Sequence, residues 1–392
     1  MSESAPQKRN ACVACTKAKR RCSKQTPACR RCVEKSIVCR YPAPRITPPY
    51  DLVFSEDGVA SVVPVPVSRA AQRLTADIVK NPWFLSPSSW TIDYTAGPLK
   101  AQISFTDESL THFINQLKSW LRQWTSEGRC PFIHANLWKV QLPDCVQDSF
   151  TALTAYQSKT KATEKMVLRI IEQRVNRLVE EQNSLAADLG VIMLDPATHL
   201  ARTQALLMYK IIRLYDGDIR ARAQAENHID ILSLWARQLW QSAGLTVSLD
   251  QAKGPLDHDS EGLVTMQLRT DGTLASTWQA WTFAESVRRT YLAATLTEAV
   301  YVTLKEGWAP CPGGITFTGG KGLWDASSPY AWLNSIRENR VVSVRCIDGE
   351  RLYSEAIPSD VDEFTDATLI VSYGLERFVQ WHDANEIEAP SG

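Results

Sequence analysis

Helical periodicity of hydrophobic positions dominates the chain from residue 83 onward. In residues 106–124, apolar side chains recur every three or four positions, and Thr106 is a candidate N-cap. The apolar face of this amphipathic helix would consist of Leu110, Phe113, Ile114, Leu117, Leu121 and Trp124. Further helices are predicted over residues 200–215, 228–244, 276–304 and 361–381, the second of them ending at Gly244. Because no strand repeat is evident, the sequence predicts a mostly α-helical body.

Residues 161–189 carry a heptad pattern that has two interpretations. The positions that alternate by three and four are Leu168, Ile171, Val175, Leu178, Gln182, Leu185 and Leu189. The flanking positions lack the complementary charge pairs of a coiled coil, which favours a core helix. A dimer contact stays open as the alternative.

Residues 40–68 differ in composition from the helical body. They contain six prolines, at positions 42, 44, 48, 49, 64 and 66. Since proline interrupts helices, this stretch predicts an extended linker. The segment that follows places Ala70, Leu74 and Ile78 on one face, which is too little for the three or four heptads of a zipper. DNA binding as a monomer and as a homodimer both stay open.

Charge is distributed unevenly along the 392 residues, although the formal net charge is zero. Residues 1–45 hold twelve Lys or Arg and two acidic residues, whereas the remaining chain holds 31 bases and 41 acids. A basic end on an acidic body predicts a polyanionic partner for that end. No apolar run approaches the ~18 residues of a membrane span, and the N-terminus lacks the apolar core of a secretory signal. We therefore expect an intracellular protein without membrane contact, in which clustered thiols hold metal.

Six of the ten cysteines form an internal repeat near the N-terminus. They are Cys12, Cys15, Cys22, Cys29, Cys32 and Cys39, and each cysteine of the second half follows its counterpart by 17 residues. Zinc binds four thiolates tetrahedrally, and a C-x2-C pair supplies two of them. Six thiolates satisfy two zinc ions if two are shared. A disulfide knot and a zinc module that binds protein are the alternatives.

The spacing resembles that of the fungal binuclear zinc-cluster DNA-binding domain, and the match covers Cys12–Cys39 with all six ligands in place. The resemblance implies two zinc ions per chain, with the first cysteine of each half bridging them. One ion would take Cys12, Cys15, Cys22 and Cys29, and the other would take Cys29, Cys32, Cys39 and Cys12. It also implies a fungal nuclear protein that binds duplex DNA, often at CGG triplets. Pro27 matches the proline that the family commonly places between the halves.

The two halves differ in charge, which predicts different roles. "TKAKRR" separates Cys15 from Cys22, whereas "VEKSIV" separates Cys32 from Cys39. Lys19 stands where the family usually keeps a base-contacting lysine, although Ala18 departs from the usual Arg or Lys before it. Lysine suits guanine O6 and N7. The candidate phosphate contacts are Lys17, Arg20, Arg21, Arg30 and Arg31. Val33, Ile37 and Val38 would pack the second half against the first.

Two stretches of the body bear on regulation. "WTFAESVRRTYL", at 281–292, resembles a recurrent segment in the regulatory regions of fungal zinc-cluster proteins. Its Glu285, Arg288 and Arg289 are predicted to form a structural ion-pair network rather than an effector site. Residues 354–369 mix acidic and apolar residues and are predicted to be a surface loop that leads into the last helix. Recruitment of the transcription machinery is the alternative.

No catalytic motif is evident. "TGGKG" at 318–322 lacks the spacing of a phosphate loop, the six histidines form no metal-binding motif, and no G-x-S-x-G occurs. Together, the patterns predict four parts: a basic tail (1–11), the zinc-cluster domain (12–39), the linker (40–68) and the helical regulatory domain (69–392). The predicted function is sequence-specific regulation of RNA polymerase II transcription. By analogy with short members of the family that it resembles, the regulated genes would form a secondary-metabolite cluster. A repressor or accessory factor and an enzyme with a zinc tether are the alternatives.

Overall fold

The computed structural model describes residues 11–25, 28–35, 37–39, 50–54, 60–64, 69–93, 106–189, 194–252, 268, 270–309, 313–339, 341–345 and 349–388. The chain divides into two compact units, Met1–Gln72 and Arg73–Gly392, and the boundary falls within helix α3 (Arg69–Lys80). In the described part of the chain, no helix combines the length and the hydrophobicity that a membrane crossing requires. The basic tail through Asn10, and Pro27, lie outside the described residues.

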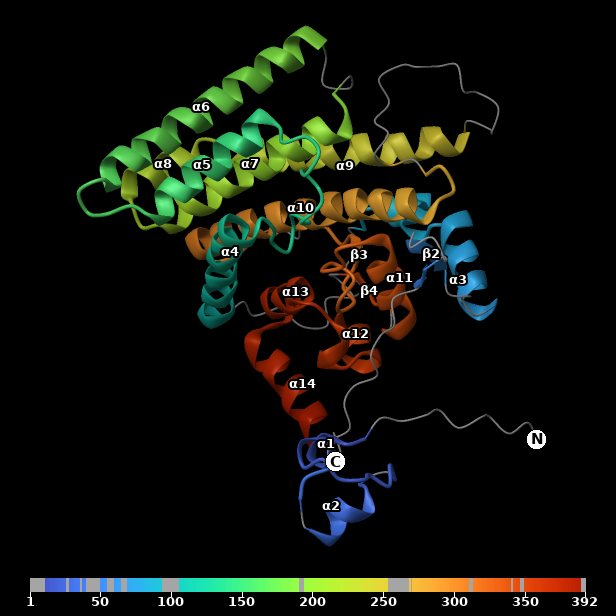
Figure 1. Ribbon diagram of the computed structural model, residues 1–392. Helices are drawn as coiled ribbons and strands as arrows, with labels where there is room; N and C mark the ends of the chain where they lie inside the picture. Colours follow the sequence, from blue (N-terminus) through green and yellow to red (C-terminus); the bar gives the residue numbers. More distant parts are fainter. Residues whose placement is uncertain are drawn as a thin grey trace. The chain divides into compact units, whose positions relative to one another are not determined.

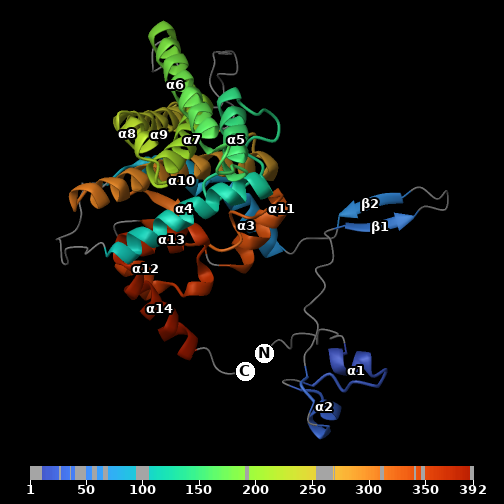
Figure 2. The same ribbon diagram turned by 90° about the vertical axis from the view of Figure 1, so that its left-hand side faces the viewer.

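The N-terminal unit contains two short helices, labelled in Figure 1, and a hairpin that is visible in Figure 2. The helices are α1 (Val13–Lys17) and α2 (Arg30–Glu34), and the antiparallel strands are β1 (Tyr50–Phe54) and β2 (Ala60–Pro64). The hairpin lies in the stretch that the sequence predicted to be an extended linker. "LVF" and "SVV" supply the β-branched and aromatic residues that strands favour, and Pro64 occurs only at the end of β2, where proline is tolerated.

The second unit is mostly helical, as the sequence predicted. Its first half comprises α4 (Asp107–Glu127), α5 (Asp144–Gln157), α6 (Glu164–Leu189), α7 (Pro196–Tyr215), α8 (Ile219–Glu226) and α9 (Ile229–Ala252). Its second half comprises α10 (Leu274–Glu306), α11 (Pro329–Glu338), α12 (Gly349–Glu355), α13 (Glu363–Tyr373) and α14 (Leu375–Glu388). Short 3-10 helices are η1 (Trp83–Leu85), η2 (Pro87–Trp90) and η5 (Pro358–Asp360). Strands β3 (Thr316–Thr318) and β4 (Ser343–Arg345) pair antiparallel, with Phe317 opposite Val344.

Helix α10 is the centre of the second unit. Helices α7 and α9 contact it on one side, where α5 and α6 also lie, and β3, α11 and α4 contact it on the other (Figures 1 and 2). Nearly every side chain along its middle is buried, including the fully buried Trp281. Such a helix belongs to the core of a large domain, since an exposed helix keeps a polar face.

The N-cap residue of α4 and the heptad pattern of α6 predicted these two helices correctly. The Thr106 hydroxyl accepts a hydrogen bond from the Ser109 backbone N–H at 3.3 Å, as an N-cap does. In α6, the heptad residues Ile171, Val175 and Leu178 are buried in the core, which confirms the core-helix interpretation for these positions. The side chains of Leu185 and Leu189 lie outside the described residues.

Two predicted helices differ in extent from those in the structure. Helix α9 continues through Gly244, because the helix packs against η2 there. A Cβ at Gly244 would lie 3.7 Å from the Trp90 Cβ, and the Trp240 indole donates to the Trp90 carbonyl at 3.1 Å. The last predicted helix is divided at Gly374, whose φ of 94° is a conformation that glycine adopts readily. The chain restarts as α14 with the Leu375 N–H bonded to the Ser109 hydroxyl at 2.9 Å.

The predicted ion-pair network lies in the core. Glu285 is fully buried, contacts both Arg288 and Arg289, and accepts a hydrogen bond from the Thr318 N–H at 2.6 Å. Arg289 also pairs with Asp362, at the start of α13. The network therefore ties α10 to β3 and α13, which confirms its structural role.

The acidic stretch 354–369 belongs to the folded body. Phe364 and Leu369 are buried in the core, and Glu363 accepts a hydrogen bond from the Trp120 indole at 2.7 Å. Phe364 and Leu369 are therefore unavailable to recruit a partner, whereas Ile357 is 47% exposed. The predicted surface loop is wrong for residues 363–369, which already belong to α13.

Candidate zinc cluster and nucleic-acid interface

The two halves of the cysteine repeat have the same backbone structure. Cys12 and Cys29 precede α1 and α2 with ψ angles of 154° and 149°. The Cys12 N–H donates to the Cys22 Sγ at 3.5 Å, and the Cys29 N–H donates to the Cys39 Sγ at 3.3 Å. The 17-residue sequence repeat is therefore also a structural repeat. Its basis is local, because each C-x2-C pair spans the first turn of a short helix.

Four of the six sulfur atoms gather in a buried cluster. The Sγ atoms of Cys12, Cys15, Cys29 and Cys32 all lie within 4.8 Å of one another. The Sγ of Cys12 is 3.8 Å from that of Cys29 and 3.7 Å from that of Cys32, and the Sγ atoms of Cys15 and Cys29 are 3.6 Å apart. An S–S bond would measure about 2.05 Å, so these contacts are not disulfides. Zn–S bonds of about 2.3 Å place neighbouring sulfurs of a tetrahedron about 3.8 Å apart, so the donor set fits zinc.

Cys22 and Cys39 flank this cluster and are half-buried. The hydrogen bond from the Cys12 backbone N–H lowers the pKa of Cys22 to about 6, and the Cys29 N–H likewise lowers the pKa of Cys39. Hydrogen bonds to sulfur favour the thiolate, which is the form that binds metal. One flanking thiol per half completes a set of six donors, enough for two zinc ions with two sulfurs shared.

The basic residues of the first half are free of ion pairs within the described part of the chain. Lys17 ends α1, and Lys19, Arg20 and Arg21 follow it directly, all with exposed side chains. Lys19 has a φ of 49°, in the left-handed region that non-glycine residues rarely adopt. Its N–H and that of Arg20 bond to the carbonyls of Thr16 and Cys15 at 3.1 and 3.0 Å, in a Schellman-type helix end.

Two basic residues of the second half, Arg30 and Arg31, have side-chain partners, whereas the exposed Lys35 forms no ion pair with the described residues. Arg30 is exposed and pairs with Glu34 at 2.9 Å. Arg31 is half-buried, and its guanidinium donates to the Cys15 Sγ of the other half at 3.9 Å. Sequence reasoning missed the contact of Arg31 because it joins residues 16 positions apart across the cluster. It also missed the backbone conformation of Lys19, which the position directly after a short helix could have suggested.

The predicted packing of the second half against the first was wrong in its residues. Val33, Ile37 and Val38 are 64%, 43% and 74% exposed. The halves are joined through the cysteines, through Arg31 and through the Arg30 backbone N–H, which donates to the Ser23 hydroxyl at 2.9 Å, because a module of this size has too little apolar area for a core. Metal ligation would then supply the stability that a core supplies in larger domains.

Comparison with known proteins agrees with this geometry. Residues 10–47 match the model of the fungal Zn(2)-Cys(6) binuclear cluster domain. The chain is also 29% identical over 259 residues to a curated protein called transcription factor gsfR2, from Penicillium aethiopicum. The alignment covers 66% of this chain and 58% of that relative's length. No solved structure matches the chain. The six cysteines, their arrangement and this match together identify residues 10–47 as similar to the fungal Zn(2)-Cys(6) binuclear cluster domain.

Proposed function

We propose that this protein is a zinc-dependent transcription factor that binds specific DNA sites and regulates RNA polymerase II genes in the nucleus. The observation that carries the proposal is the asymmetry of the zinc module. Both halves hold cysteines in the same geometry, but among the described residues the first presents a run of exposed cations in no ion pair (Lys17, Lys19, Arg20 and Arg21), whereas the second presents only Lys35 in this way. A polyanion in contact with that half would be held by charge. The name of the curated relative supports the same function.

In this proposal, the six cysteines would hold two zinc ions, and Cys12 and Cys29, whose Sγ atoms are 3.8 Å apart, would be the two shared ligands. Cys15 and Cys22 would complete the ligands of one ion, and Cys32 and Cys39 those of the other. Zinc would act structurally here, fixing α1 and its basic end for contact with DNA.

The exposed end of α1 would enter the major groove. Lys19 is the proposed base-reading residue, with guanines of CGG triplets as its targets, because lysine donates to O6 and N7. Lys17, Arg20, Arg21 and Arg30 are proposed to contact phosphates, which adds affinity without sequence information. Arg31 was also predicted to contact phosphate, but its hydrogen bond to the Cys15 Sγ would compete with a phosphate contact.

The helical body, residues 69–392, would receive a signal or recruit the transcription machinery. Activation of a pathway-specific gene set, such as a secondary-metabolite cluster, is the proposed outcome. A reporter carrying residues 69–392 fused to an unrelated DNA-binding domain distinguishes an activator, which raises expression, from a repressor or accessory factor.

Selection of sites from a randomised duplex pool by the full chain tests DNA binding. We expect enrichment of CGG-containing sites by the zinc-loaded protein and loss of enrichment after chelation. One enriched triplet indicates a monomer, and two indicate a homodimer. A zinc-loaded, folded protein that retains no duplex at low salt would refute the proposal.

A further inference from the structure

We propose that the body carries a binding site for a small organic monoanion, between the β3–β4 hairpin and α12. A cavity of about 310 Å³ lies there. Its lining residues are Thr316, Val341, Val342, Ser343, Arg345, Arg351, Leu352, Glu355 and Ala356. Ligand pockets for small molecules begin at about 300 Å³. The lining residues all belong to the helical body, and this proposal does not depend on the function proposed for the zinc module.

The chemistry of the lining selects the class of ligand. Val342, Leu352 and Ala356 are buried and form an apolar wall. Arg345 and Arg351 provide two guanidinium groups, and Glu355 provides one carboxylate. The lining residues alone carry a surplus of one positive charge, because Asp93, which contacts Arg345 at 3.9 Å, is not among them. This surplus suits a monoanion better than a doubly charged phosphate, which Glu355 and Asp93 would repel. A carboxylate on a small apolar body fits this combination, since arginine binds carboxylates in a bidentate manner.

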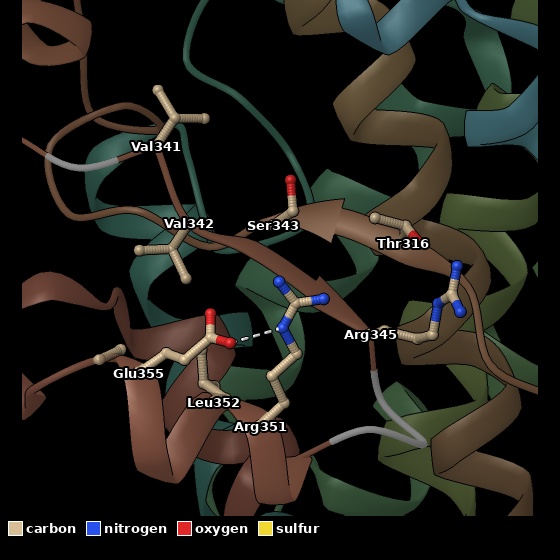
Figure 3. Close-up of a pocket in the computed structure, with 9 residues that line it drawn as sticks. Thr316, Val341, Val342, Ser343, Arg345, Arg351, Leu352 and Glu355 are labelled. Atoms are coloured by element: carbon tan, nitrogen blue, oxygen red, sulfur yellow. Dashed lines mark hydrogen bonds and ion pairs between the residues drawn. The ribbon is translucent and has the colours of Figure 1, made fainter. Parts of the chain in front are cut away.

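Both arginines line the cavity. Figure 3 shows the Arg351 side chain reaching from α12 toward the strand that carries Ser343. Arg351 pairs with Glu355 at 2.8 Å, one helical turn away, and its side chain is 69% exposed. An exposed pair of this kind contributes little, so a ligand carboxylate can replace Glu355. Arg345 contacts Asp93 at 3.9 Å, the outer limit of an ion pair, and is 47% exposed.

The walls of the cavity are fixed by contacts outside it. The Gly319 N–H bonds to the Val342 carbonyl at 2.9 Å, which holds the chain as it enters β4. At the start of α12, the Gly349 N–H bonds to the Tyr373 hydroxyl at 2.6 Å. At its end, the Ala356 carbonyl accepts from the Trp381 indole at 3.2 Å. A site whose walls are already in place loses little entropy when a ligand binds.

Titration of the zinc-loaded full chain with benzoate and with benzamide, its neutral counterpart, tests the site. We expect benzoate to bind and benzamide to bind at least about tenfold more weakly, because only the carboxylate makes charge-assisted bonds to arginine. Arg345→Gln and Arg351→Gln should each weaken benzoate binding by about tenfold. Ser343→Trp, at an exposed position of the lining, should block the cavity without changing its charge.

Arg237→Gln is the matched control, since Arg237 is an exposed arginine of α9 that does not line the cavity. It should bind benzoate as the unaltered chain does, and thermal unfolding should show that all variants are folded. Absence of benzoate binding, equal binding of benzamide, or binding that survives all three cavity variants would overturn the proposal. DNA binding measured on the same samples reports on the zinc module alone, so failure of one proposal is distinguishable from failure of the other.

Discussion

The guanidinium of Arg31 donates a hydrogen bond to the Cys15 Sγ at 3.9 Å and so joins the two halves of the zinc module. Ala14 occupies the corresponding place in the first half, so the repeat does not duplicate this contact. Six thiolates with two zinc ions carry a net charge of about −2, and a guanidinium at a ligand sulfur stabilises that charge. Arg31 is therefore positioned to support the metal cluster.

Arg31→Gln should release zinc faster than the unaltered protein, because Cys15 loses its charged hydrogen-bond donor. Release to a chromophoric chelator, followed by stopped flow, measures this. Arg30→Gln is the control, and it should leave zinc release unchanged. It should make the slope of log binding constant against log salt concentration shallower by about 0.9, as expected for one lost phosphate contact. If Arg31→Gln changes only the salt slope, Arg31 is a phosphate contact instead.

Lys19→Gly should separate the fold of the module from DNA recognition. Glycine relieves the left-handed backbone at φ 49°, which costs a side-chain-bearing residue about 1–2 kcal/mol, so the zinc-loaded variant should resist unfolding at least as well. Loss of the lysine should weaken discrimination between selected and scrambled duplexes by about 1–3 kcal/mol. Chelator resistance and competition binding measure the two effects. Discrimination that survives in Lys19→Gly would remove Lys19 from base reading.

Arg289→Met should destabilise the body strongly. Arg289 is 1% exposed and bonds to the carbonyls of Pro131 and Thr318, at 3.2 and 2.7 Å, as well as to Asp362. Removing one partner of a buried pair leaves an uncompensated charge, at a cost of about 3–5 kcal/mol. Urea unfolding measures the change, with the exposed Arg237→Gln as control. A loss below 1 kcal/mol would contradict the structural role of the network.

Asp366 should make the body less stable as the pH rises. Burial, followed by the nearby Asp362 and Glu363 charges, raises the pKa of Asp366 from 3.8 to about 7. A carboxyl whose pKa is raised on folding favours the folded state at low pH, and that contribution is lost as the pH rises through the folded value. Asp366→Asn should therefore raise stability by about 1–3 kcal/mol at pH 8 relative to the unaltered chain, with a smaller gain at pH 5. Thermal unfolding at both pH values measures this, and an equal effect at the two values would contradict the assignment.

Features that depend on neighbouring residues could be predicted before the chain's fold was known. The spacing of the six cysteines gave the donor set, because a C-x2-C pair at the start of a helix fixes its own geometry. The start of α4 could also be predicted, because the Thr106 side chain caps a backbone N–H only three residues away. The charge difference between the halves of the module was likewise readable, since side-chain charge at an exposed site needs no tertiary context.

Helix bounds, strand pairing and side-chain contacts that depend on residues far apart in sequence were set only by folding. Helix α9 continues through Gly244 because η2 packs against it, and β3 finds its partner β4 some 25 residues later along the chain. Val33 is exposed although its side chain is apolar, because the module has no core to receive it. Arg31 meets Cys15, and the cavity beside α12 forms, only when the chain has folded. These outcomes follow from the packing of segments far apart in sequence, which no local pattern records.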